Sequence, residues 1–97
     1  MVYVVAEQDL DPPISAEEWR TLRRDSGWCR DLYGVRHLDS YLSGDGRRLL
    51  CVWDAPDAEA VRQFYRTMAL PTRVVWTAEA HGPQEPLAVP PPDEKGR

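Results

Sequence analysis

The order of strand-like and helix-like segments is the feature that most constrains the fold of this chain. Runs rich in β-branched and aromatic residues, which favour strands, occupy residues 2–8, 35–43, 47–55 and 73–79. Apolar residues at helical spacing follow Ser15 and, later, Asp57. The chain therefore predicts the order strand, helix, strand, strand, helix, strand.

Local signals mark where these segments begin and turn. Ser15 and Glu18 have the spacing of a capping box, in which each side chain accepts a hydrogen bond from the other residue's backbone. Asp57 stands at the N-cap position of the second helix. Residues 43–47 predict a hairpin with a three-residue loop, in which Gly46 takes the left-handed conformation.

This order of segments is that of a ferredoxin-like α+β fold, a four-stranded antiparallel sheet with two helices on one face. The other face is left bare, and a chain of 97 residues has little core to spare. A second copy packed sheet to sheet covers that face, so we expect a homodimer, a dimeric α/β barrel-like assembly. Residues 1–81 form the domain, and the proline-rich sequence of residues 82–97 predicts a disordered tail.

Charge and composition exclude several classes of partner. The net charge is −4, whereas a nucleic-acid partner requires a basic surface. No apolar run is long enough to cross a membrane, and the N-terminal residues lack the basic region of a signal peptide. The two cysteines, Cys29 and Cys51, have no metal or redox spacing, so free thiols and a cytoplasmic location are expected. No phosphate-binding, haem or flavin motif indicates a cofactor.

Three stretches resemble one family of small proteins. They are LDSYLS at residues 38–43, CVWDAPDAEAVR at residues 51–62, and Leu70-Pro71. The pattern is similar to HSYVS, CVYEAPSPEAIR and GLP in small bacterial ferredoxin-like proteins described as nickel-binding or of unknown function. The resemblance covers roughly residues 2–80 and implies a homodimer of ferredoxin-like subunits, with nickel as a possible ligand.

Within this resemblance, Ser40, Tyr41 and Cys51 occupy matched positions. The family's usual histidine before Ser-Tyr is replaced by Asp39, and His37 stands two positions earlier. No residue is therefore assigned as a metal ligand from the resemblance.

The three-residue hairpin loop predicts which side chains share a face of the sheet, because side chains alternate along a strand. The predicted open face carries a mixed set: His37, Asp39, Tyr41, Cys51 and Trp53, with Leu49 and Val35 beside them. The predicted helix-covered face carries an apolar set: Leu38, Leu42, Leu50 and Val52.

The mixed face predicts a binding pocket. His37 and Asp39 lie about 6.6 Å apart along a strand, which suits proton transfer, and Tyr41 can polarise a carbonyl group. These three are the predicted catalytic residues. The predicted substrate-binding residues are Trp53, Cys51, Trp76 and Tyr3. The leading hypothesis is a dimeric protein that binds a small molecule in this pocket, as a cofactor-free cyclase or isomerase if it is an enzyme.

Three alternatives stay open at this point. The same polar and aromatic face is also typical of a wet dimer interface. A non-enzymatic nickel-binding protein is the second functional hypothesis, and a two-histidine site requires His37 and His81 to converge. The third alternative is an interaction module whose tail binds a partner protein.

Overall fold

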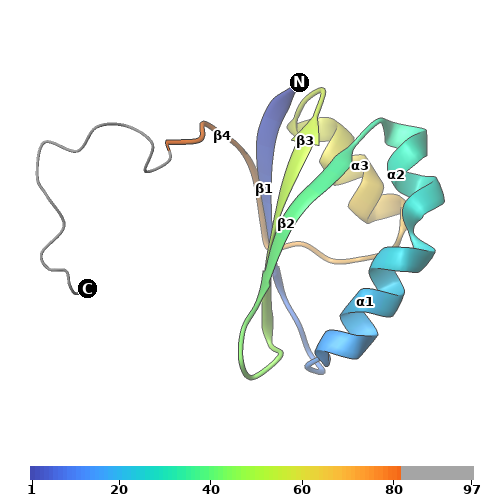
Figure 1. Ribbon diagram of the computed structural model, residues 1–97, viewed down its shortest axis with the longest axis vertical. Helices are drawn as coiled ribbons and strands as arrows, with labels where there is room; N and C mark the ends of the chain where they lie inside the picture. The colour runs from blue at the N-terminus through green and yellow to red at the C-terminus, as the bar shows by residue number, and fades with distance from the viewer. Residues whose placement is uncertain (82–97) are drawn as a thin grey trace, which may run out of the picture.

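The computed structural model describes residues 1–81 as a four-stranded antiparallel sheet with three helices on one of its faces (Figure 1). The elements in chain order are β1 Val2–Asp9, α1 Ala16–Asp25, α2 Gly27–Tyr33, β2 Arg36–Leu42, β3 Arg48–Ala55, α3 Ala58–Thr67 and β4 Val74–Ala78. The strand order β2-β3-β1-β4 is compatible with a ferredoxin-like topology and confirms the α+β class. The predicted tail at residues 82–97 lies outside the described residues.

The predicted capping box is present at the start of α1. The hydroxyl of Ser15 accepts a hydrogen bond from the Glu18 amide at 3.0 Å, and the Glu18 carboxylate accepts one from the Ser15 amide at 2.8 Å. The first helix was predicted as one piece, but it is divided at Ser26 into α1 and α2. Gly34 ends α2 with φ of 67°, in the left-handed region where glycine carries no steric penalty.

Helix α3 supplies most of the helical contribution to the core. Asp57 accepts a hydrogen bond from the Ala60 amide at 2.8 Å, which confirms it as the N-cap. Val61, Phe64 and Tyr65 form the buried stripe of the helix. They belong to one buried cluster with side chains of α2, the segment before β2, and strands β1, β3 and β4: Cys29, Val35, Val4, Ala6, Leu49, Cys51, Trp53, Ala55 and Val75.

The hairpin between β2 and β3 has a four-residue loop rather than the predicted three-residue loop. The Ser43 amide donates to the Arg48 carbonyl at 2.9 Å, which leaves residues 44–47 as the loop. The Ser43 hydroxyl accepts from the Arg48 amide at 2.9 Å, and Asp45 accepts from the same hydroxyl at 2.7 Å. Gly46 has the predicted positive φ, 73°, and a Cβ there would collide with the carbonyl oxygen of Ile14.

A bulge in β2 changes the register a second time. His37 pairs with Trp53, but Asp39 pairs with Val52, so Leu38 is the extra residue between them. A three-residue loop also predicts that His37 lies opposite Trp53, and this pairing is observed because the longer loop and the bulge compensate each other at that point. Between the bulge and the loop, each residue pairs with a partner one position away from the one expected for a three-residue loop. The observed pairs are Ser40 with Cys51, Tyr41 with Leu50, and Leu42 with Leu49.

A displacement of one residue moves side chains to the opposite face of a sheet, so much of the predicted face assignment is wrong. Residues predicted on the open face lie instead on the helix side: His37, Leu49, Cys51 and Trp53, with Val35 also in the helix-side core. Residues predicted beneath the helices lie instead on the open face: Leu50 and Val52. Asp39 and Tyr41 lie on the open face as predicted, and Leu42 packs on the core as predicted.

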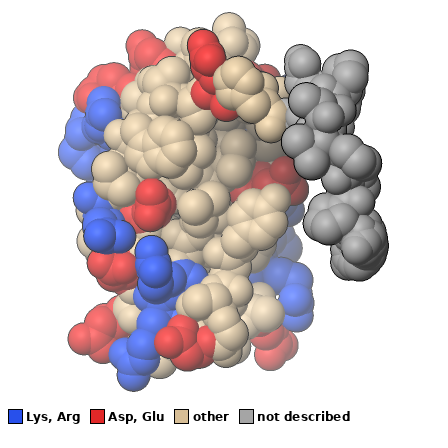
Figure 2. Space-filling view, turned by 90° about the vertical axis from the view of Figure 1, so that its left-hand side faces the viewer, with Lys and Arg blue, Asp and Glu red and all other residues tan. Residues whose placement is uncertain are grey.

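The open face of the sheet is apolar at its centre and carries charged side chains toward both ends. Val5 lies between its partners Val52 and Trp76, and Tyr3 is 43% exposed beside them. Figure 2 shows this face, with uncharged side chains across its upper part and positive and negative side chains mixed below. No helix among residues 1–81 is long and apolar enough to cross a membrane.

Candidate ligand pocket beneath the helices

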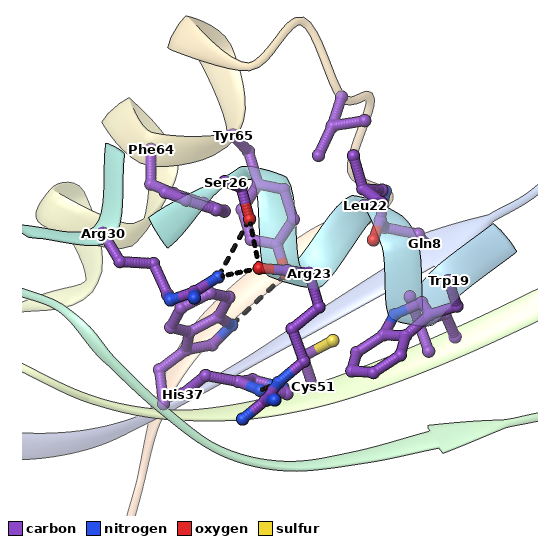
Figure 3. Close-up of a pocket in the computed structure, with 13 residues that line it drawn as sticks. Gln8, Trp19, Leu22, Arg23, Ser26, Arg30, His37, Cys51, Phe64 and Tyr65 are labelled. Carbon is purple, nitrogen blue, oxygen red and sulfur yellow. Dashed lines mark hydrogen bonds between the residues drawn. The ribbon is translucent and has the colours of Figure 1, made fainter. Parts of the chain in front are cut away.

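A small pocket lies between the helices and the sheet, on the side opposite the open face (Figure 3). Its cavity volume is about 40 Å³. We call it the helix-side pocket and define it by the residues that line it: Gln8, Trp19, Leu22, Arg23, Ser26, Arg30, His37, Leu49, Cys51, Trp53, Phe64, Tyr65 and Leu70. These residues come from all three helices, from β1, β2 and β3, and from the segment after α3, so the whole fold contributes to one site.

His37 is the polar centre of the pocket. The Nε group of Arg23 donates a hydrogen bond to Nδ1 of His37 at 2.8 Å. Nδ1 is therefore unprotonated, and Nε2 carries the ring proton and donates it to the Ser40 hydroxyl at 2.5 Å. The imidazole also lies between two indole rings, with centroid distances of 5.5 Å to Trp19 and 5.0 Å to Trp53.

This tautomer decides what the serine and histidine can do. A histidine that activates a serine must accept the hydroxyl proton, but here Nε2 of His37 is the donor toward Ser40. The nitrogen that can accept, Nδ1, is occupied by Arg23. The pair therefore does not have the arrangement of a nucleophilic serine and its base. The Ser40 hydroxyl instead contacts the Cys51 sulfur at 3.6 Å and continues the polar chain inward.

Two guanidinium groups stand at the pocket and are held by neutral partners. Arg30 donates from Nη1 to the Arg23 carbonyl and to the Ser26 hydroxyl, both at 2.8 Å. The Arg23 guanidinium also lies over the Trp19 ring, 5.9 Å from its centroid. Figure 3 shows the Arg23 side chain lying close to His37 and Arg30 reaching toward Ser26.

Burial and the two arginines set the protonation states in the pocket. Burial, followed by the nearby positive charges of Arg23 and Arg30, lowers the pKa of His37 from 6.5 to about 4. Burial raises the pKa of the Cys51 thiol and that of the Tyr65 hydroxyl above their ordinary values. At neutral pH the histidine, the thiol and the phenol are all uncharged, and the arginines are the charged groups of the pocket.

We expect the free energy of unfolding to fall as the pH is lowered from 6.5 to about 4, because the unfolded chain binds a proton at the ordinary pKa while folded His37 resists it. This contribution is fully present above pH 6.5 and is lost as the pH falls through the folded pKa. His37 is only partly buried, so solvent screening reduces the contribution to about 1–2 kcal/mol.

The measurement is urea unfolding at a series of pH values, with His37→Gln as the test variant. Glutamine keeps an acceptor for Arg23 and does not titrate, so this variant should lose that part of the pH dependence. His81→Gln is the matched control, because His81 is exposed and its ring pairs, within residues 1–81, with the carboxylate of Glu79. An equal slope in His37→Gln and in the unmodified chain would contradict the assigned protonation state.

The predicted site residues are divided between the two sides of the sheet. His37, Cys51 and Trp53 line the helix-side pocket. The other four lie on the open face: Asp39, Tyr41, Tyr3 and Trp76. The three predicted catalytic residues therefore do not line a common pocket, because the bulge at Leu38 separates His37 from Asp39.

Neither Arg23 nor Arg30 was predicted as a site residue from the sequence. The missed signal is their separation of seven residues, which places two side chains on the same side of a helical segment. That spacing does not predict a site by itself, because the two arginines form one only together with His37 of β2.

Comparison with known proteins gives a family. The family model described as "Nickel responsive protein SCO4226-like" matches residues 3–77, which is most of the chain. The chain belongs to the SCO4226-like family. The resemblance found in the sequence is thereby confirmed. A solved structure, the crystal structure of SCO4226 from Streptomyces coelicolor A3(2), matches this fold with a TM-score of 0.73.

The likeness to SCO4226 is a likeness of fold, because the two sequences are 10% identical. The match covers 82% of this chain and 99% of the SCO4226 chain. The search of curated proteins gives no match. The chemistry of the helix-side pocket therefore has to be argued from the residues of this member of the family.

The nickel named in the family's description does not fit the side chains of a single chain. Among residues 1–81, no group of three or more histidine, cysteine, aspartate and glutamate side chains is placed to hold a metal ion. Both ring nitrogens of His37 are engaged, one by Arg23 and the other by Ser40. Two guanidinium groups beside the ring also repel a divalent cation.

Proposed function

We propose that this member of the SCO4226-like family binds a small organic molecule in the helix-side pocket. The observation that supports the proposal is that the pocket has an apolar interior, with polar groups from separate helices and strands gathered at one side of it. Trp53, Phe64 and Tyr65 form the interior, while Arg23, Arg30 and His37 converge at its polar side. A pocket that is mostly apolar, with a few converging polar groups, is the usual form of a small-molecule site.

The proposal is for a binding protein, and it assigns no reaction. The acid-base trio of the cyclase or isomerase hypothesis is split across the sheet, so His37 does not share a site with Asp39 and Tyr41. His37 orients Arg23 by accepting its hydrogen bond. The Ser40 hydroxyl holds the imidazole ring in place by accepting a hydrogen bond from the Nε2–H group. These residues support recognition by holding donors in place before a ligand arrives.

The test uses butyrate and butan-1-ol as probes and follows the indole N–H signals of the tryptophans by NMR. Trp53 and Trp19 line the pocket, whereas Trp28 is 59% exposed on α2 and serves as an internal reference. At least one probe should shift the signals of Trp53 and Trp19 in a saturable way and leave Trp28 unchanged.

A matched pair of variants controls this experiment. Leu22→Phe enlarges a side chain that lines the pocket and should weaken binding roughly tenfold or more. Leu32→Phe makes the same change on α2 at a residue that is 63% exposed, and it should leave binding unaltered. Binding that is equal in the two variants, or no response of Trp53 to either probe, would overturn the proposal.

We also propose that the protein is a homodimer joined through its open sheet faces. The proposal is supported by the apolar centre formed by Val5, Val52 and Trp76, with the large exposed side chains Tyr3 and Tyr41 beside it. A second copy covers the same patch on both subunits about a twofold axis.

We propose a reducing cytoplasm as the location of the protein, because it keeps the two buried thiols reduced.

Nickel binding is the second candidate function, and the family's description favours it. Since residues 1–81 of one chain do not assemble three ligands, this candidate requires ligands from outside those residues, and a second copy of the chain is one source of them. Nickel sulfate is therefore added as a further titrant in the NMR experiment. Saturable binding at micromolar concentrations would favour this candidate, and its absence would remove it.

A further inference from the structure

The charges around the helix-side pocket are one-sided. Its lining includes the guanidinium groups of Arg23 and Arg30 and no aspartate or glutamate. Elsewhere in residues 1–81, arginines pair with carboxylates within 4.0 Å, as in Arg36 with Asp54 and Arg66 with Glu59. No such ion pair forms at Arg23 or Arg30 within the described part of the chain, so the charged side chains that line the pocket are both positive. The Asp39 carboxylate lies outside this lining, on the open face, and only partly offsets their effect on the pKa of His37.

Each of these arginines keeps donors to spare. A guanidinium has five N–H groups. Arg30 uses Nη1 for the Arg23 carbonyl and for Ser26, and Arg23 uses Nε for His37. These hydrogen bonds fix the position of each group and leave Nη atoms of both arginines for a further acceptor. Planar guanidinium donors match the two oxygens of a carboxylate.

The size of the cavity limits the rest of the ligand. One water molecule needs about 10–15 Å³ of cavity volume, so the cavity of about 40 Å³ holds roughly three such molecules. Its inner wall is formed by aromatic and apolar side chains, among them Trp53 and Phe64. This space suits a short aliphatic chain better than a ring or a sugar.

We propose, building on the helix-side pocket as a binding site, that its ligand is a short aliphatic carboxylic acid bound as the carboxylate. The carboxylate accepts hydrogen bonds from Arg23 and Arg30, and the chain of about three carbons enters among the aromatic side chains. A neutral alcohol of the same length keeps the apolar contact and loses the ionic one. An alkylammonium ion is repelled by both arginines.

The experiment compares butyrate, butan-1-ol and butylammonium by the shift of the Trp53 indole signal. Butyrate should bind at least tenfold more tightly than butan-1-ol, and butylammonium should not bind. Arg23→Gln and Arg30→Gln should each reduce butyrate affinity roughly tenfold to a hundredfold while leaving butan-1-ol nearly unchanged. Arg20→Gln is the matched control, because Arg20 is exposed on α1 and is not part of the lining.

A second readout separates recognition of the carboxylate from a general structural role. Bound carboxylate offsets the positive charge of Arg23 and Arg30, so the pKa of His37 should rise from about 4 when butyrate is present. The ring-proton signals of His37 report this change. Arg23→Lys keeps the charge and should recover part of the preference for butyrate.

The two levels of the proposal fail in different ways. If butan-1-ol binds at Trp53 as tightly as butyrate, the helix-side pocket remains a binding site and the carboxylate assignment is overturned. If no probe affects Trp53, the proposed function and this inference are both overturned. Equal losses of butyrate affinity in Arg20→Gln and Arg23→Gln would also overturn the assignment.

Discussion

Val52→Glu is expected to convert the proposed homodimer into monomers. Val52 lies at the centre of the open face, paired with Val5 on one side and Asp39 on the other. In the dimer the new carboxylate is buried without a partner, which costs about 3–5 kcal/mol and raises the dissociation constant by roughly two to four decades. Val52 is partly exposed in a single subunit, so the fold itself tolerates the charge.

Sedimentation or light scattering at tens of micromolar protein measures this effect. Gln63→Glu is the matched control, because it adds the same charge on the exposed side of α3 and should leave the dimer intact. A dimer that persists in Val52→Glu places the interface elsewhere. A monomer in the unmodified protein would reject the sheet-to-sheet arrangement altogether.

The choice of Val52 shows what the sequence could not supply. Sequence reasoning placed Leu49 on the open face, but Leu49 is 4% exposed in the helix-side core. A charge at Leu49 would destabilise each subunit and could not report on the dimer. The error arises because neighbouring residues of a strand point to opposite faces, so a misjudgement of one residue exchanges core and surface.

The parts of the fold encoded by local chemistry could be predicted. Ser15 with Glu18, Asp57 as an N-cap, and Gly46 at a positive φ each depend on contacts within a few residues. The order of the elements follows from hydrophobic periodicity, which is also local along the chain. These features are present in the structure as expected, except that the first helix is divided at Ser26.

The hairpin register depends on contacts that no short segment reveals. The Ser43 hydroxyl and the Asp45 carboxylate bind the amides of the loop and support a four-residue connection. Gly46 is also fixed from outside the hairpin, because the Ile14 amide donates to its carbonyl at 3.0 Å. The bulge at Leu38 then returns His37 to the register expected for it. The longer loop and the bulge cannot be predicted from the alternation of polar and apolar residues along the two strands.

The candidate site was predicted only in part for the same reason. His37, Trp53 and Cys51 were identified as functional candidates, and the structure brings these three together in the helix-side pocket. Their partners Arg23 and Arg30 lie on another part of the chain and meet His37 only after α1 and α2 have packed on the sheet. A site built across elements is visible in the fold and not in the spacing of its residues.

Trp53→Ala is expected to lower the free energy of unfolding by about 3–5 kcal/mol, which is a large part of the stability of a domain this small. The Trp53 side chain is 3% exposed and its ring contacts those of Phe64 and Tyr65 at centroid distances of 5.0 and 5.9 Å. Its indole also donates to the Tyr65 hydroxyl at 3.2 Å, so the variant leaves a buried hydroxyl without that partner.

Denaturant unfolding measures this loss, and Trp28→Ala is the matched control. Trp28 is 59% exposed on α2, so its removal should change stability by about 0.5 kcal/mol or less. The same pair of variants discriminates between the two possible positions of Trp53. If Trp53 faced a partner subunit across the open sheet, its loss would weaken the dimer and leave each subunit nearly as stable as before. A loss of several kcal/mol that does not depend on protein concentration places it in the helix-side core, where it forms the inner wall of the pocket.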